Sequence, residues 1–332
     1  MPTLHRARLQ IYIYTGTVTS SPAATNLRYT LDKTKISTQT NILFEIAELV
    51  RDYLTHSFND DYASVTAWVT CITTLYESDA TDSEFASGSP VTQSFLAFDG
   101  FGTFEDGINP QLSDNALFSN SRFYIPEDTA GKFPILAEGV GKVIIDGVTT
   151  QITDNGNSNQ KIQYITIPAN SSTIQIYDTN DSTLDKTITI DNVCEPKHTI
   201  YKVTFVNKYG AYQDMYFFKK TTESMTIKDE TFKTNTIDNA SVTYATYKGQ
   251  RQRYNTMAQT KIELNTGFVN EDFNLAVEEL LLSENVWIRF ESKTLPVIPT
   301  KLDMTFKTSV NDKLINHTLQ FEFAFNKINN VR

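Results

Sequence analysis

The sequence is poor in cysteine, in histidine and in long apolar runs, and each shortage argues against a class of protein. Its two cysteines, Cys71 and Cys194, lie far apart and lack CxxC spacing, so neither a disulfide framework nor a thiolate metal site is expected. The four histidines include no HExxH pattern. No run approaches the ~20 apolar residues of a membrane-spanning helix. Since no apolar segment follows the first basic residues, we expect no secretory signal and assembly in the cytoplasm.

Catalytic motifs are also missing. The sequence contains no GxSxG turn, no GxxxxGK[ST] loop and no GxGxxG between a strand and a helix. Two carboxylate pairs, Glu105 with Asp106 and Glu278 with Glu279, are adjacent in sequence. Adjacent side chains on a helix point about 100° apart, so they do not face one bond as acid and base catalysis requires. We therefore predict a protein that is not an enzyme and has no cofactor, metal site or catalytic residue.

Basic residues are outnumbered. The chain has 29 lysines and arginines against 39 aspartates and glutamates, a formal net charge of -10. A general nucleic-acid binder needs a basic face, so that function is not expected. What the sequence does contain in abundance is aromatic residues, 21 Phe and 16 Tyr, together with Thr and Asn throughout. Such a composition favours strands and turns, and predicts a mainly β protein.

The first segment, residues 1–112, is predicted to be an α+β lobe. Apolar residues alternate with polar ones from Ala7 to Ile13, which predicts a strand paired with a second one at 28–31. Apolar residues then recur at helical spacing over roughly 41–55, which predicts an amphipathic helix. Strands follow near 65–75 and 95–98. The Asn-, Pro- and Ser-rich stretch 107–120 indicates a linker, where we place the first boundary.

The middle segment, residues 113–196, is predicted to be a small inserted β-sandwich. Its apolar runs are short, turn clusters separate them, and no helical pattern occurs. The predicted strands lie near 143–145, 162–167, 174–177 and 188–190.

The last segment, residues 197–332, is predicted to be a second α+β lobe. Its elements, in order, are a hairpin at 201–218 turned by 207–210, strands near 242–247 and 261–264, a helix capped by Asn270 and ended by 283–285, a strand at 286–290, and a closing hairpin of 302–306 with 314–325. The first and last segments thus share a plan of strands, one helix and more strands.

One basic cluster, residues 248–254, has an aromatic neighbour. Its cations Lys248, Arg251 and Arg253 are possible subunit-contact residues. Two interpretations stay open: an exposed hairpin tip, or a contact with an acidic neighbouring subunit or nucleic acid. An acidic chain with a local basic tip suits head-to-tail assembly with copies of itself.

Three strings of the last segment, residues 201–210, 279–288 and 311–318, resemble structural proteins of tailed bacteriophages. The combination of helix, Val-Trp strand and terminal hairpin is similar to the tail-tube-like domains of baseplate, distal-tail and tail-hub proteins. The resemblance covers 197–332 best, the first segment weakly and the middle hardly at all. It implies two tail-tube-like (split-barrel) lobes, each with one amphipathic helix, flanking the inserted sandwich.

The resemblance also implies a function. The chain would be a virion protein that forms a ring, six-fold or pseudo-six-fold, in the tail or baseplate region and contacts other tail proteins. Nucleic acid would enter only as DNA passing through the ring. Distal tail, hub, connector and capsid decoration all fit the sequence equally well.

Two other functions fit as alternatives. One is a host-surface or carbohydrate-binding adhesin, in which the middle segment presents Tyr164 and Tyr177 to a sugar. The other is a polysaccharide hydrolase that uses Glu105 or Asp106.

Overall fold

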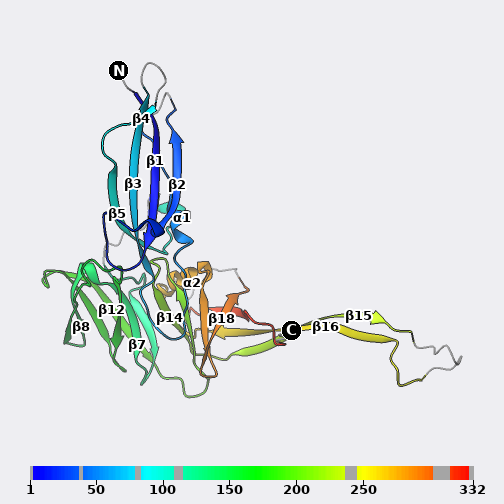
Figure 1. Cartoon of the computed structure of the whole chain (residues 1–332). Coiled ribbons are helices and arrows are strands. Elements are labelled where there is room, and N and C mark those ends of the chain that lie inside the picture. The colour runs from blue at the N-terminus through cyan, green and yellow to red at the C-terminus, as the bar shows by residue number, and fades with distance from the viewer. Residues whose placement is uncertain are drawn as a thin grey trace. The chain divides into compact units, whose positions relative to one another are not determined.

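The computed structural model describes residues 3–36, 40–78, 84–107, 115–235, 245–301 and 315–328. In these ranges the protein is mainly β, as the composition predicts (Figure 1). The strands are β1 (Thr3–Tyr14), β2 (Leu27–Thr34), β3 (Thr66–Ser78), β4 (Glu84–Ala86), β5 (Val91–Phe98), β6 (Arg122–Pro126), β7 (Gly131–Leu136), β8 (Val140–Ile145), β9 (Val148–Gln151), β10 (Ile162–Ile167), β11 (Thr173–Asp178), β12 (Leu184–Val193), β13 (Tyr201–Val206), β14 (Tyr212–Phe217), β15 (Thr222–Lys233), β16 (Arg251–Asn265), β17 (Val286–Phe290), β18 (Lys293–Pro299) and β19 (Thr318–Phe323). The helices are α1 (Ala47–Arg51) and α2 (Phe273–Leu282), with 3-10 turns η1 (Ala24–Asn26), η2 (Phe104–Asp106) and η3 (Ala137–Gly139).

The chain forms two compact units. The first contains Met1–Asn192 and Phe205–Asp214, and the second contains Val193–Thr204 and Met215–Arg332. The sheets recorded for the described ranges are all open, and none closes into a barrel. Neither helix in these ranges has the length and apolar character needed to cross a membrane. The division into three segments stays a prediction, although the strands of each segment form sheets of their own.

The first sheet has the order β2-β1-β3-β4, with β5 also paired to β3. The alternation in β1 has the predicted effect: Leu9, Ile11 and Ile13 are buried on one face. The register places Ile11 opposite Tyr29 of β2 and Cys71 of β3. The strand predictions for this segment are therefore confirmed.

The first helix is much shorter than predicted. Only Ala47–Arg51 is helical, where the spacing of apolar residues predicted a helix over roughly 41–55. No side chain caps its N-terminus at Ile46, and the Leu43 carbonyl in the preceding backbone accepts from the Lys33 ammonium at 2.7 Å. The apolar residues whose spacing predicted the helix still pack on the first sheet. Most of them do so from non-helical backbone, because a side chain can be buried without its backbone being helical.

The middle strands form two sheets, β10-β7 and β6-β12-β11-β8-β9. Aromatic rings fill the space beside β6 and β7, since Phe118 lies 5.4 Å from Phe123 and 5.2 Å from Phe133 between ring centroids. A Cβ at Gly131 would come within 2.8 Å of the Ile125 side chain, so the two sheets approach closely at this glycine. The four strands predicted here are confirmed.

The hairpin of β13 and β14 turns at residues 207–210, as predicted. Asn207 is fully buried, and its Oδ1 accepts hydrogen bonds from the backbone N–H groups of Tyr209 and Ala211 at 3.1 Å. Gly210 has a φ of 75°, and a Cβ there would lie 2.9 Å from the Asp99 backbone nitrogen. The turn thus requires glycine for its conformation and for its close approach to Asp99.

A sheet with the order β14-β13-β17-β18-β19-β16-β15 belongs mostly to the second unit, while residues 205–206 of β13 and 212–214 of β14 belong to the first. Helix α2 buries Phe273, Val277 and Leu280, and ends at Ser283 as predicted. Its N-cap lies two residues later than predicted, since Asp272 rather than Asn270 precedes the first helical residue. Strand 286–290 is confirmed as β17. The predicted hairpin strand 302–306 and its turn lie outside the described residues.

Candidate functional site

The first candidate is a long β-ribbon, which we call the β-arm and define as residues 222–233 and 251–257. Figure 1 shows β15 and the first half of β16 extending away from the other strands of their own unit. All twelve residues of β15 are exposed. Strand β16 continues into the core, where Ile262 and Leu264 are fully buried and pair with β19. The β-arm is therefore an extension of a core strand.

The register gives the β-arm two apolar faces. Phe232 and Tyr254 pack edge to face with ring centroids 5.6 Å apart. Met257 pairs with Lys228 and so lies on the same face, while Met225 and Ile227 lie on the other. The register shifts between Lys228 and Glu230, where Asn255 of β16 has a φ of 50°. The five apolar side chains are all about half exposed or more, at 53% for Met225, 50% for Ile227, 45% for Phe232, 48% for Tyr254 and 47% for Met257.

Such a ribbon is incomplete by itself. A two-stranded hairpin alone is marginally stable in water, because it buries too little apolar surface. Strand β15 also ends the order of its sheet, so its outer edge is an edge strand twelve residues long. Exposed edges and apolar faces of this length are places where another chain adds or packs. The β-arm therefore has the properties of an interaction surface.

The predicted subunit-contact residues lie on or next to the β-arm. Lys248 is exposed in the turn before β16, and Arg251 begins that strand opposite Lys233. Arg253 is already engaged, because its Nε donates to Asp229 Oδ2 at 2.8 Å. The structure thus brings the three cations together at one end of the ribbon.

Strand β15 was not predicted from the sequence. A signal for it exists, since Glu223, Met225 and Ile227 alternate with Ser224 and Thr226. Exposure on both faces weakens that signal, because half-burial is what gives strands a clear apolar alternation. The strand predicted at 242–247 falls partly outside the described residues, and 245–247 form a turn.

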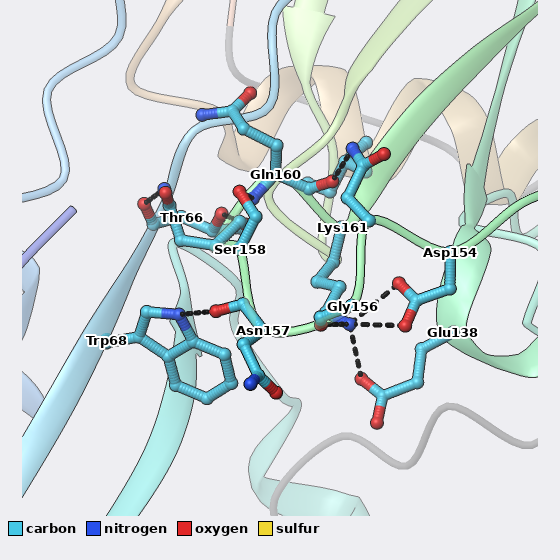
Figure 2. A network of polar contacts seen from close by, with 12 residues as sticks. Thr66, Trp68, Glu138, Asp154, Gly156, Asn157, Ser158, Gln160 and Lys161 are labelled. Atoms are coloured by element: carbon cyan, nitrogen blue, oxygen red, sulfur yellow. Dashed lines mark hydrogen bonds and ion pairs between the residues drawn. The ribbon is translucent and has the colours of Figure 1, made fainter. Parts of the chain in front are cut away.

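The second candidate lies in the first unit, around the loop 154–161 (Figure 2). Its anchor is Lys161, whose side chain is only 3% exposed. The ammonium donates to both oxygens of Asp154, at 2.7 and 2.6 Å, and to the Gly156 carbonyl, while Glu138 lies 3.8 Å away. A buried charge is tolerated when it is paired in this way.

Other residues of the same loop bind the first sheet. The buried Asn159 accepts from the Gly16 N–H at 2.8 Å and donates to the Thr66 carbonyl at 2.6 Å. The Trp68 indole donates to the Asn157 carbonyl at 3.1 Å, as Figure 2 shows. The loop is thereby fixed at both ends, which makes it a rigid support for the side chains on its outer surface.

The candidates for catalysis and sugar stacking are not brought together. Glu105 is exposed in η2, and Glu279 is 5% exposed in α2. Tyr177 receives the Lys142 ammonium 4.6 Å from its ring centroid. Tyr164 is partly buried, and its hydroxyl accepts from the Tyr212 N–H at 2.8 Å, while burial raises the pKa of that hydroxyl.

Among described residues no group of three or more His, Cys, Asp or Glu could hold a metal.

Beside the turn at Gly210, the Asp99 carboxylate lies close to His56 and Arg51. Asp99 lies 3.0 Å from His56 Nε2 and 3.2 Å from Arg51 Nε. Burial alone would raise the pKa of Asp99, but His56 and Arg51 outweigh it and hold that pKa below its usual value.

A lowered carboxylate pKa sets the pH dependence of stability. Asp99 contributes to the free energy of unfolding through its lowered pKa. This contribution is complete above the pKa of Asp99 in the unfolded chain, about 3.9, and is lost as pH falls through its lower pKa in the folded chain. We expect Asp99→Asn to be less stable than the native chain at pH 7, with the gap closing below about pH 4. Urea unfolding across this pH range measures the gap, with the exposed Asp52→Asn as control. A gap that stays constant down to pH 2 contradicts the prediction.

Comparison with known proteins gives no relative to this chain: no family model matches it, and neither a curated protein nor a solved structure does.

Proposed function

We propose that this chain is a non-enzymatic structural protein of a tailed-bacteriophage virion, which assembles with copies of itself into a ring in the tail or baseplate region. The β-arm is the observation that carries the proposal. Its two faces expose five large apolar side chains on a ribbon that another chain must cover for full stability. The mainly β architecture and the resemblance of residues 197–332 to tail-tube-like domains support the virion setting.

Charge favours a second copy as the partner of the β-arm. The whole chain has a net charge of -10, while Lys248, Arg251 and Arg253 gather at one end of the ribbon. A cationic end attracts the acidic remainder of a neighbouring copy, which is a head-to-tail contact that closes into a ring when the rotation permits. The two tail-tube-like lobes and the contacts with other tail proteins belong to the same proposal.

The test is the mass and shape of the purified protein. We expect electron microscopy to show closed rings of three-fold or six-fold symmetry. The double variant Phe232→Ser, Tyr254→Ser removes the packed face of the β-arm and should weaken association ~10-fold or more, because each ring contributes ~1 kcal/mol or more when buried. Mass photometry over a concentration series measures the shift.

A matched control is Val148→Ser, which removes a 70% exposed apolar side chain on β9 of the first unit. The control should keep the native mass.

Charge reversal at Arg251 and Arg253 should also weaken association. Its effect should be larger at low salt than at high salt, because salt screens charge interactions. Native monomers at every concentration, or an unchanged mass in both β-arm variants, would contradict assembly through the β-arm.

A further inference from the structure

A polar cleft of about 490 Å³ opens on the first unit. One side is formed by residues 60–64, which precede β3, and the other by the outer surface of loop 154–161 and the start of β10. Figure 2 shows the Gln160 side chain directed away from the Lys161 ammonium that anchors the loop. The volume lies within the ~300–1,000 Å³ range of small-molecule sites.

The lining presents both donors and acceptors. Asp60 and Asp61 supply carboxylate oxygens, and Gln160 supplies an amide that donates and accepts. Tyr62 and Tyr164 also line the cleft, with ring centroids 5.3 Å apart. The cleft therefore combines hydrogen-bonding groups with aromatic surface.

Several lining groups are held in place before any ligand arrives. Ser64 Oγ accepts from the Ile162 N–H at 3.2 Å, and Gln163 Nε2 donates to the Thr153 carbonyl at 2.8 Å. Loop 154–161 is fixed by the network around Lys161 and Asn159. Such preorganisation reduces the entropy lost on binding.

From this chemistry we propose that the cleft binds a neutral oligosaccharide. Each sugar hydroxyl both donates and accepts, so it matches a lining in which carboxylates accept and amides do both. The apolar faces of sugar rings match the two tyrosines. Of the two tyrosines named in the sequence analysis as possible sugar contacts, Tyr164 lines the cleft and Tyr177 does not.

The charges disfavour other ligand classes. The lining contains one lysine, Lys132, and two aspartates, and this lysine already donates to Thr166 Oγ1 at 2.8 Å. A phosphate or uronic acid would therefore meet net negative charge. An apolar ligand would leave the carboxylates and amides without partners, since Ala63 and Ile162 are the aliphatic residues of the lining.

The experiment uses the full chain. It is first screened on an array of bacterial surface and cell-wall glycans, and neutral and uronic-acid oligosaccharides are then titrated by calorimetry. We expect neutral oligosaccharides to bind and uronic-acid ones to bind at least ~10-fold more weakly. Asp61→Asn and Gln160→Ala change exposed side chains of the cleft and should each lower the affinity ~10-fold, the effect of losing one or two hydrogen bonds.

The matched controls are Asp52→Asn and Gln151→Ala, which make the same changes at exposed positions outside the cleft. They should bind like the native chain. No binding on the array, a preference for anionic glycans, or native affinity in both cleft variants overturns the inference. The oligomer mass is measured on the same samples to separate the two proposals. Rings that bind no glycan would contradict only the proposal for the cleft. Monomers that bind glycan would contradict only the proposal of ring assembly.

Discussion

Replacing Asn207 by alanine is expected to lower the free energy of unfolding by about 3 to 5 kcal/mol, since each buried group left without a partner costs about 1 to 3 kcal/mol. The Asn207 amide donates to the Leu117 carbonyl at 2.8 Å and to Gln213 Oε1 at 3.0 Å. Its oxygen accepts from the N–H groups of Tyr209 and Ala211. Asn207, Ala211 and Gln213 are all buried, so water does not replace the lost contacts.

Urea unfolding measures this loss. The control is Asn59→Ala, the same change at an exposed loop position of the first unit, which should cost less than about 0.5 kcal/mol. A loss below about 1 kcal/mol at Asn207 would show that the turn does not depend on this side chain.

The second large effect is expected at the buried ammonium of Lys161. Asp154→Ala leaves that charge with the Gly156 carbonyl and with Glu138 at 3.8 Å. Removing one partner of a buried pair costs about 3 to 5 kcal/mol, and we expect about 2 to 4 here because the Asp154 side chain is 32% exposed. Lys161→Met removes the charge itself and keeps much of the apolar stem, so it should cost less.

The order of these effects is the test. In urea unfolding the double variant Asp154→Ala, Lys161→Met should be more stable than Asp154→Ala alone, because no buried charge is left unpaired. If Lys161→Met is the more damaging single change, the ammonium is not buried as the structure places it.

Local patterns in the sequence predicted most of the strands. The alternation from Ala7 to Ile13 and the short runs of the middle segment correspond to β1, β8, β10, β11 and β12. The turn residues 207–210 fixed the position of a hairpin, because Asn and Gly have conformational and hydrogen-bonding properties that act within a few residues. Helix α1 was predicted too long, since apolar side chains at helical spacing also pack from non-helical backbone.

The candidate sites were predicted less completely. The cations Lys248, Arg251 and Arg253 pointed to the end of the β-arm, but strand β15 and the length of the ribbon were missed. Of the cleft, the sequence indicated only Tyr164, as a possible sugar contact, and the cleft itself was missed. No local pattern signals it, since Asp61 and Gln160 belong to loops about a hundred residues apart and each loop alone reads as a polar turn.

By itself, then, the sequence determined the β character of this protein, its main hairpin turn and the positions of most strands, because these follow from side-chain periodicity and turn chemistry over a few residues. Only the tertiary structure decided that β16 runs from the core into an exposed ribbon, and that Lys161 fixes one wall of a cleft whose other wall precedes β3. Those arrangements depend on contacts between distant segments, which local periodicity does not encode.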